Sequence, residues 1–200
     1  MGMRRRMRRM TIYDKKPLPD GVSAAGRGLQ PRPAIRRSDK KMKPDTETEI
    51  RIADIRNCPE VIPVLAQWFE DEFGYEDVTK EDETSWLEQS LQTDEGLPTT
   101  LVAYAGGILV GTARIFTDEM DDRPQYNPWF GYWFVLPSHR KQGIGTALDQ
   151  ARLKAAKKEK IGRVYLCTHT QKAYRFKRDW RLIEERIYYG HDAAVFYKDL

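Results

Sequence analysis

The sequence is poor in cysteine and histidine and has no long apolar run. Its 200 residues include two cysteines, Cys58 and Cys167, and three histidines. Two cysteines give neither a disulfide framework nor a metal-ligand spacing, and they fit a reducing compartment. No stretch approaches the roughly 18 apolar residues of a membrane-spanning helix, and no apolar segment follows the arginine-rich start as in a secretory signal peptide. We therefore expect a cytoplasmic protein with no membrane-spanning part and no metal site.

Charge divides unevenly along the chain. The net charge is +4, but residues 1–48 hold 14 Lys and Arg against 5 Asp and Glu, whereas residues 49–200 hold 20 against 25. The basic balance thus belongs to the first segment, and the rest of the chain is acidic. A nucleic-acid interaction inferred from basic charge can therefore involve only residues 1–48.

Residues 1–48 are rich in arginine, lysine, proline and glycine and show neither helical nor strand periodicity. Prolines interrupt any long helix; they are Pro17, Pro19, Pro31, Pro33 and Pro44. We interpret the segment as a disordered basic tail. Two roles stay open for it: a basic arm that contacts nucleic acid weakly, or a dispensable extension, in which case Met42 would start a shorter product.

Residues 49–200 show the periodicities of a single folded domain. Thr79 followed by Asp82 is a capping-box pattern that starts a helix, and Gly106-Gly107 between two apolar runs predicts a hairpin. The predicted elements are strand 49–53, helix 59–73, a helix from Thr79, strands 101–104 and 108–115, strand 129–136, helix 143–159, strand 164–167, a short helix 171–178, and strands 182–189 and 193–197. This order predicts an α+β or mixed α/β fold.

The most specific chemical signal lies between strand 129–136 and helix 143–159. Gly143 and Gly145 allow the backbone to approach a ligand closely. The first N–H groups of the helix have no partner within it and, together with the helix dipole, favour an anion such as a phosphate group. Arg140 adds a positive charge beside them. The segment therefore predicts a phosphate-binding loop.

Three known phosphate-binding loops can be compared with this segment. A P-loop requires Gly-Lys followed by Ser or Thr, which is absent. A dinucleotide-binding fingerprint requires a small residue where Leu148 stands and an acidic residue about 20 positions on, near Thr168. The remaining pattern, V-x-P followed by R-x-x-G-x-G, matches the pyrophosphate loop of acyl-CoA-dependent transferases at Val135, Pro137, Arg140, Gly143 and Gly145.

In this loop and in the order of its elements, the segment 49–200 resembles the GNAT superfamily of acetyl-CoA-dependent N-acetyltransferases. The ending Phe196-Tyr197-Lys198-Asp199-Leu200 is similar to the family's last strand. The resemblance implies a mostly antiparallel sheet of about seven strands with about four flanking helices, and a splay between the fourth and fifth strands. It also implies acetyl-CoA as co-substrate, bound by Phe134, Val135, Arg140, Lys141, Gln142, Gly143, Ile144, Gly145, Thr146 and Arg175.

The resemblance further implies direct attack of an amine on the acetyl-CoA thioester, so a base is needed. An amine of pKa about 10.4 arrives as an ammonium and must lose a proton. His169, just after strand 164–167, is the first candidate, and Glu119 or Asp121 acting through water is the alternative. His169 also has a structural interpretation, as a hydrogen-bonded histidine that holds the following loop.

Two other steps need a donor group. A backbone N–H near Phe134 or Val135 is expected to stabilise the oxyanion of the attacked carbonyl. Tyr174 is the candidate acid for the departing thiolate, or alternatively a ring packed under the last strands. Arg175 stands where the family usually has its tyrosine, and it can stabilise the thiolate or bind a phosphate.

Acidic residues crowd two places in residues 49–200. One cluster, at the joint of the first two predicted helices, consists of Glu70, Asp71, Glu72, Glu76, Asp77, Glu81, Asp82 and Glu83, and a second of Asp118, Glu119, Asp121 and Asp122. Such clusters steer cationic ligands, although they are also typical of solvated helix faces. We expect an enzyme that acetylates a primary amine of a cationic small molecule. A peptide or protein amine, and a regulator that binds acyl-CoA without transfer, are the alternatives; monomer and homodimer are both open.

Overall fold

The protein is described by a computed structural model that covers residues 49–73, 79–92, 94, 96–169, 178–188 and 190–200. The predicted tail 1–48 lies outside the described residues, and so does the predicted helix 171–178 apart from Arg178. None of the described helices has the length and apolar character that crossing a bilayer requires.

Seven strands and three α-helices make up the described part of the chain. The strands are β1 Ile50–Asp54, β2 Thr99–Ala105, β3 Ile108–Phe116, β4 Trp129–Val135, β5 Arg163–Thr168, β6 Arg181–Tyr188 and β7 His191–Asp199, and the helices are α1 Ile62–Phe73, α2 Lys80–Glu88 and α3 Ile144–Lys158. Short 3-10 turns precede α1 and α3 and follow β1 and α2. Every predicted element that falls within the described residues is confirmed, with boundaries displaced by a few residues.

Local signals account for two of these boundaries. The Thr79 hydroxyl accepts a hydrogen bond from the Asp82 N–H, and the Asp82 carboxylate accepts one from the Thr79 N–H, so the predicted capping box begins α2. Gly106 and Gly107 have φ angles of 57° and 82°. A two-residue hairpin turn requires such a left-handed pair, which explains the glycines between β2 and β3.

The strands form one sheet in the order β1-β2-β3-β4-β5-β7-β6. All neighbours are antiparallel except β4 and β5, which are parallel and aligned at a single pair, Trp129 with Tyr165. The Tyr165 N–H donates to the Pro128 carbonyl at 2.9 Å beside that pair. Because the pairing is confined to the start of β4, the two strands diverge towards their carboxyl ends. The predicted α+β sheet with a splay between its fourth and fifth strands is confirmed.

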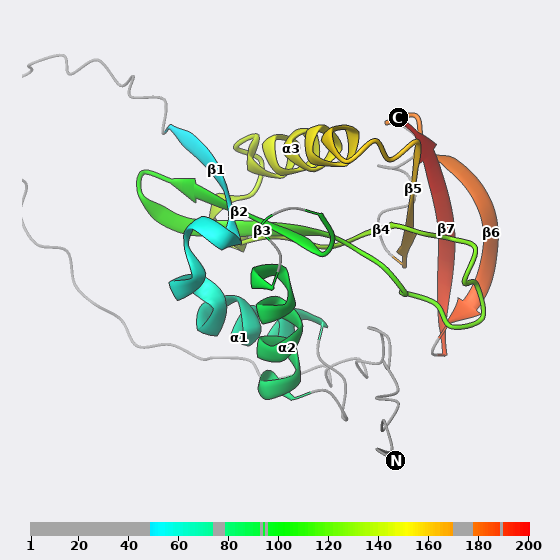
Figure 1. The fold of residues 1–200 in the computed structure, drawn as a ribbon, viewed down its shortest axis with the longest axis horizontal. Helices are drawn as coiled ribbons and strands as arrows, with labels where there is room; N and C mark the ends of the chain where they lie inside the picture. The colour runs from blue at the N-terminus through cyan, green and yellow to red at the C-terminus, as the bar shows by residue number, and fades with distance from the viewer. Residues whose placement is uncertain (1–48, 74–78, 93, 95, 170–177, 189) are drawn as a thin grey trace, which may run out of the picture.

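The helices cover the two faces of the sheet unequally. Figure 1 shows α3 above one face and α1 and α2 below the other. The α1–α2 face has a core that includes Leu65, Phe69, Leu87 and Trp129. On the opposite face, α3 packs its buried side chains over the middle of the sheet. The central strands β3 and β4 are therefore buried on both sides, and β4 ends between the two helical layers.

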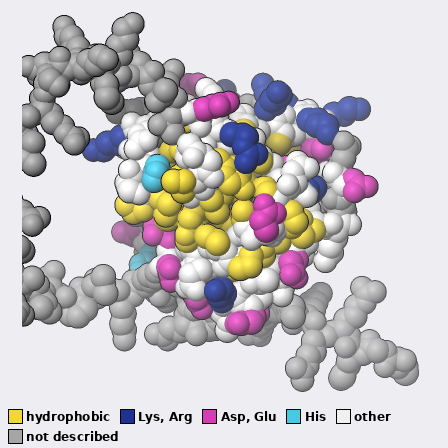
Figure 2. Space-filling model, turned by 90° about the vertical axis from the view of Figure 1, so that its left-hand side faces the viewer, with side chains coloured by type: hydrophobic (Ala, Val, Ile, Leu, Met, Phe, Trp, Pro, Cys, Tyr) yellow, Lys and Arg dark blue, Asp and Glu magenta, His cyan; other side chains and the backbone are white. Residues whose placement is uncertain are grey.

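One end of the molecule exposes apolar side chains. Figure 2 shows hydrophobic groups gathered in the middle of the end that carries the β2–β3 hairpin, with acidic groups along its lower edge. Val64 of α1 and Ile108 of β3 are among the exposed large hydrophobic residues. In Figure 1 the segment from β4 to α3 lies at this end, so the glycine loop borders an apolar surface.

Candidate active site

The candidate site begins at a bulge in β4. The pairs on either side of it are Thr112 with Phe134 and Arg114 with Gly131, so β4 has one more residue than β3 between them. Tyr132 is the extra residue, with a φ of 48°, which is uncommon for any residue other than glycine. Such a bulge bends its strand and re-aims the residues that follow. The residues that follow here are the ones that enter the splay.

After the bulge, the edge of β4 that faces the splay presents Val135. The Leu136 N–H donates to the Val110 carbonyl of β3 at 2.9 Å. Since N–H groups alternate in direction along a strand, the Val135 N–H points away from β3, towards the diverging β5. The Val135 carbonyl points the same way, because the N–H and C=O of one residue in a strand face the same side, and it accepts a hydrogen bond from Arg140 Nε at 3.0 Å. One N–H at the end of β4 is thus directed into the space between β4 and β5.

The loop from β4 to α3 has the geometry that an anion site requires. Gly143 is the N-cap of α3 with a φ of 83°, and a Cβ added there would meet nothing within 4 Å. The first helical bond runs from the Ala147 N–H to the Gly143 carbonyl at 2.9 Å. The N–H groups of Ile144, Gly145 and Thr146 therefore lie in the first turn without a partner in the helix. This geometry fits a diphosphate, with a positive helix end and an open approach.

Gly145 has a packing role that the sequence did not reveal. A Cβ at this position would lie 3.0 Å from the Trp133 ring. Trp133 Nε1 also donates to the Gly145 carbonyl at 3.1 Å. The second glycine of the motif therefore permits close contact between α3 and β4, while the first supplies the left-handed cap.

The remaining loop residues shape the approach to α3, and most of them are exposed. Gln142 Nε2 donates to the Ser138 carbonyl at 3.3 Å, and the Ser138 hydroxyl lies 2.9 Å from His139 Nδ1. Lys141 has a φ of 63° and is exposed. His139 thus belongs to the loop surface, and Lys141 can meet a phosphate without leaving water.

Arg178 is a residue near the loop that sequence reasoning missed. Its Nη2 donates to the Thr146 hydroxyl at 2.8 Å, and its Nη1 lies 3.7 Å from an Asp149 carboxylate oxygen. Arg178 follows the segment 170–177, which is outside the described residues together with the predicted site residues Tyr174 and Arg175. No sequence motif marked Arg178, because its partners are contributed by α3.

His169 lies just beyond the carboxyl end of β5, on the far side of the splay from Val135. Its Nδ1 is 2.9 Å from the Asp192 carbonyl oxygen, and its ring meets His191 edge-on at 5.8 Å between centroids. A carbonyl can only accept, so Nδ1 carries the proton and the lone pair is on Nε2. The hydrogen bond therefore anchors the ring and, in the neutral imidazole, places the lone pair on Nε2, an atom that the surrounding residues bury.

Glu119 lies on the β3–β4 loop near the same end of β5. Burial, with the nearby charge of Glu119, raises the pKa of the Cys167 thiol, so the carboxylate is close to the last residues of β5. The Glu119 carbonyl accepts a hydrogen bond from the Tyr188 hydroxyl at 3.1 Å. The structure thus brings Glu119 and His169 to one end of β5, while Asp121 is exposed.

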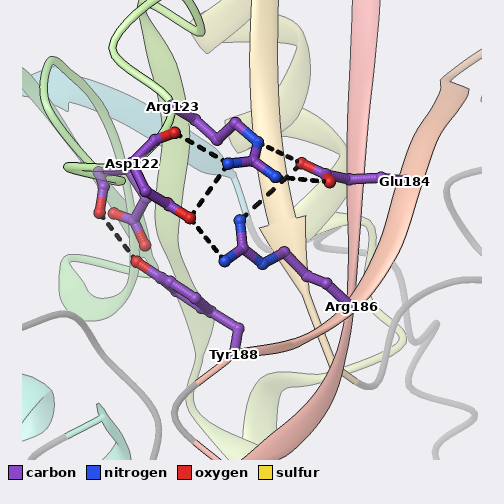
Figure 3. Close-up of polar contacts among 6 residues, drawn as sticks. Asp122, Arg123, Glu184, Arg186 and Tyr188 are labelled. Carbon is purple, nitrogen blue, oxygen red and sulfur yellow. Dashed lines mark hydrogen bonds and ion pairs between the residues drawn. The ribbon is translucent and has the colours of Figure 1, made fainter.

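A network of ion pairs fixes the loop that carries Glu119. Figure 3 shows Arg123 paired with Glu184 of β6 and Asp122 paired with Arg186 of β6. The Arg123–Glu184 contact is bidentate, at 2.9 and 3.0 Å, and the hydrogen bond from Arg186 lowers the pKa of Asp122. Of the four residues of the second acidic cluster, Asp122 is therefore neutralised by arginine, and the ion pairs tie the loop to the edge strand β6.

The first acidic cluster contains a buried member. Glu83 of α2 is 1% exposed, and its Oε2 has no hydrogen-bond partner among the described residues. Burial raises its pKa to about 7, with the nearby Arg114 acting in the opposite direction. Glu83 lies one helical turn before the buried Leu87, and this spacing was the sequence signal that could have identified it.

A buried ion pair lies under α3. Arg152 is fully buried and its Nη2 donates to the Asp149 carboxylate at 2.6 Å. Ile144, Leu148, Arg152 and Ala156 follow one another at intervals of four residues and are all buried. The buried face of this helix therefore includes an arginine in line with its hydrophobic residues.

The site can now be compared with known proteins. Residues 62–177 match the sequence model of the GNAT acetyltransferase family. The chain belongs to the GNAT acetyltransferase family. Acetyl-CoA is the co-substrate of GNAT enzymes, and the Gly143 cap, the free first turn of α3 and the basic Arg140 fit its diphosphate. No curated protein matches the chain by sequence.

Solved structures share the GNAT fold with this chain. An acetyltransferase from Streptococcus pneumoniae is 18% identical with a TM-score of 0.57, over 76% of this chain and 100% of the other. The protein yncA from Salmonella typhimurium, solved with acetyl-CoA, is 16% identical with a TM-score of 0.57, over 78% and 95%. An N-acetyltransferase from Staphylococcus aureus is 16% identical with a TM-score of 0.59, over 76% and 99%.

Proposed function

We propose that the protein transfers the acetyl group of acetyl-CoA to a primary amine of a cationic small molecule, and that residues 49–200 carry this activity. The observation that carries the proposal is the arrangement at the end of β4, where the Val135 N–H enters the splay beside the glycine loop. After the ammonium has lost a proton to the base, attack of the neutral amine forms an amide C–N bond, breaks the thioester C–S bond, and releases the CoA thiolate and one further proton.

In this proposal the loop residues hold the co-substrate. The first turn of α3, with Arg140 and Lys141, binds the diphosphate. The Val135 N–H lies where it can donate to the thioester carbonyl oxygen as negative charge develops there. Arg140 serves both tasks, since its Nε fixes the Val135 carbonyl while the rest of its exposed guanidinium faces solvent.

We assign the base to His169. The hydrogen bond from Nδ1 to the Asp192 carbonyl favours the tautomer that accepts a proton at Nε2. Its position after β5, across the splay from Val135, supports this role. Glu119 is the alternative at the same end of β5. Tyr174 and Arg175 remain predictions for the thiolate side.

The cationic acceptor is supported by charge on the α1–α2 side. Residues 49–200 carry more acidic than basic residues. Glu72 and Glu81, from the facing ends of α1 and α2, are exposed, as is Asp121 on the β3–β4 loop. Exposed carboxylates of this kind raise the local concentration of cations.

The test measures thiol release from acetyl-CoA with a panel of amines: polyamines, aminoglycosides, basic peptides, and neutral amines of similar size. We expect turnover with the small cations, and a kcat/KM that falls as salt is added. Preference for peptides would identify the alternative acceptor. Calorimetric titration with acetyl-CoA tests the remaining alternative, a regulator that binds acyl-CoA without transfer. Tight binding without turnover of any amine would indicate this regulator.

A further inference from the structure

The bulge at Tyr132 is a strained feature in the middle of a buried sheet. A residue other than glycine keeps a positive φ only where its surroundings hold it there. The neighbouring Gly131 leaves no room for adjustment, because a Cβ at that position would lie 2.7 Å from the Phe116 ring. The contacts that hold the bulge can therefore be sought on the two faces of β4.

On the α1–α2 face, the bulge is held by Arg114 of β3. This arginine is 4% exposed. Its guanidinium carbon lies 5.1 Å from the centre of the Tyr132 ring, and its Nη2 donates to the Trp86 carbonyl of α2 at 2.9 Å. Glu83, also in α2, is the acidic group whose charge acts on it. Arg114 thus joins α2 to the strained residue itself.

On the α3 face, the bulge is held by Arg152. This arginine has no exposed surface. Its guanidinium carbon lies 4.1 Å from the centre of the Phe130 ring, and its Nη1 donates to the Gly131 carbonyl at 3.4 Å. Its carboxylate partner is Asp149, also buried. Arg152 thus fixes the peptide group that leads into Tyr132.

Two buried arginines at one bulge require an explanation. Burying a charge is costly unless it is paired and hydrogen-bonded, and apolar residues of similar size usually give equal or greater stability. Here each arginine has an acidic neighbour on its own side, Glu83 or Asp149, and each guanidinium lies over an aromatic ring of β4. Planar stacking combined with directed N–H groups is a property that lysine and apolar residues lack.

We propose that Arg114 and Arg152 are positioning residues that hold the β4 bulge from opposite faces of the sheet and thereby aim the Val135 N–H at the thioester carbonyl. The holding of the bulge by the two arginines concerns the strand alone. The aiming of the Val135 N–H rests on the proposed function of that group. The holding and the aiming can be tested separately.

The strand can be observed directly by selective labelling. Tyr132-Trp133 is the one Tyr-Trp pair in the sequence, and Phe134-Val135 is the one Phe-Val pair. Full-length protein carrying ¹³C-carbonyl tyrosine and ¹⁵N tryptophan therefore gives a single carbonyl-edited amide signal, that of Trp133. Labelling with ¹³C-carbonyl phenylalanine and ¹⁵N valine does the same for Val135. These two signals report on the bulge and on the proposed donor.

The variants are R114K and R152K, with R163K as the matched control. Arg163 also stacks on a tyrosine, Tyr197 at 4.3 Å, and also pairs with a carboxylate, Asp199 at 2.6 Å, but it is on the exposed start of β5. We expect the Trp133 and Val135 signals to move in R114K and R152K and to stay in place in R163K. If the lysine variants do not fold, E83Q and D149N keep both arginines and should move the same signals by a smaller amount.

Kinetic measurements test whether the bulge aims the Val135 N–H at the thioester carbonyl. We expect kcat to fall by about 10- to 100-fold in R114K and R152K, with the KM for acetyl-CoA within about twofold of wild type because the loop is untouched. Signals that stay at their wild-type positions in all four variants would overturn the positioning role. Moved signals with an unchanged kcat would overturn the aiming of Val135. Moved signals in a protein that acetylates no amine would support the positioning role and reject the proposed function.

Discussion

The buried carboxyl of Glu83 makes a quantitative prediction about stability. Folding transfers this group from water to a site that is 1% exposed, and burial raises its pKa from 4.5 to about 7. Arg114 opposes the shift, whereas Asp82 of the same helix and Glu70 of α1 reinforce it. The folded protein therefore retains a proton that the unfolded chain releases.

The direction of the pH dependence follows from proton binding. Between pH 4.5 and about 7 the folded state binds more protons than the unfolded state at this site, so the free energy of unfolding falls as pH rises. Between about pH 5 and about pH 8.5 this one group removes about 2.5 kcal/mol of stability. Above the folded pKa the loss levels off, because both states are then ionised.

The substitution E83Q isolates this contribution. Glutamine imitates the protonated carboxyl in size but does not titrate, so E83Q and wild type should be similarly stable near pH 5, and E83Q should be the more stable by about 2 kcal/mol near pH 8.5. Urea denaturation followed by tryptophan fluorescence at a series of pH values measures the difference. E88Q, an exposed glutamate of the same helix, is the control and should follow the wild-type curve. Parallel curves for wild type and E83Q would refute the reasoning.

Three further predictions concern the strand, the loop and the base. G131A should lower the free energy of unfolding by about 1–3 kcal/mol, measured by the same urea titration, because the new methyl would meet the Phe116 ring at 2.7 Å; unchanged stability would contradict the packing at the bulge. G143D should weaken acetyl-CoA binding by about tenfold or more, since it places a negative charge beside the proposed diphosphate site, at a residue with a left-handed conformation. Calorimetric titration measures the affinity, and an unchanged affinity would show that this loop does not bind the co-substrate. H169Q should lower kcat by about 10²- to 10⁴-fold with little change in KM; an unaffected kcat would move the base to Glu119.

Sequence reasoning succeeded where a signal is local. The helix starting after Thr79 and the hairpin at Gly106-Gly107 depend on residues within one turn of each other, and both were confirmed. The glycine loop was predictable for the same reason, because Gly143 needs a left-handed conformation whatever surrounds it. The order of these elements then restricted the fold to a small set.

The features that sequence reasoning missed depend on contacts between distant segments. The bulge at Tyr132 leaves no local pattern, since it is defined by the pairing of β4 with β3. Glu83 looked like one more solvated acid of a charged helix, and only its spacing from Leu87 hinted at burial. Arg152 interrupts an apolar face, and a periodicity argument treats it as an exception rather than as the centre of a buried pair.

The two glycines of the loop motif show how the co-substrate site and the strand form one unit. Gly143 gives α3 its left-handed cap, whereas Gly145 lets α3 approach Trp133, whose indole N–H donates to the Gly145 carbonyl. Trp133 follows the bulge directly, and Val135 lies two residues further on. The contact between Trp133 and Gly145 therefore joins the strand that carries the Val135 N–H to the first turn of α3. In the proposed reaction the diphosphate at one end of the co-substrate and the thioester at the other must be held at a fixed separation, and we propose that this contact between β4 and α3 sets it.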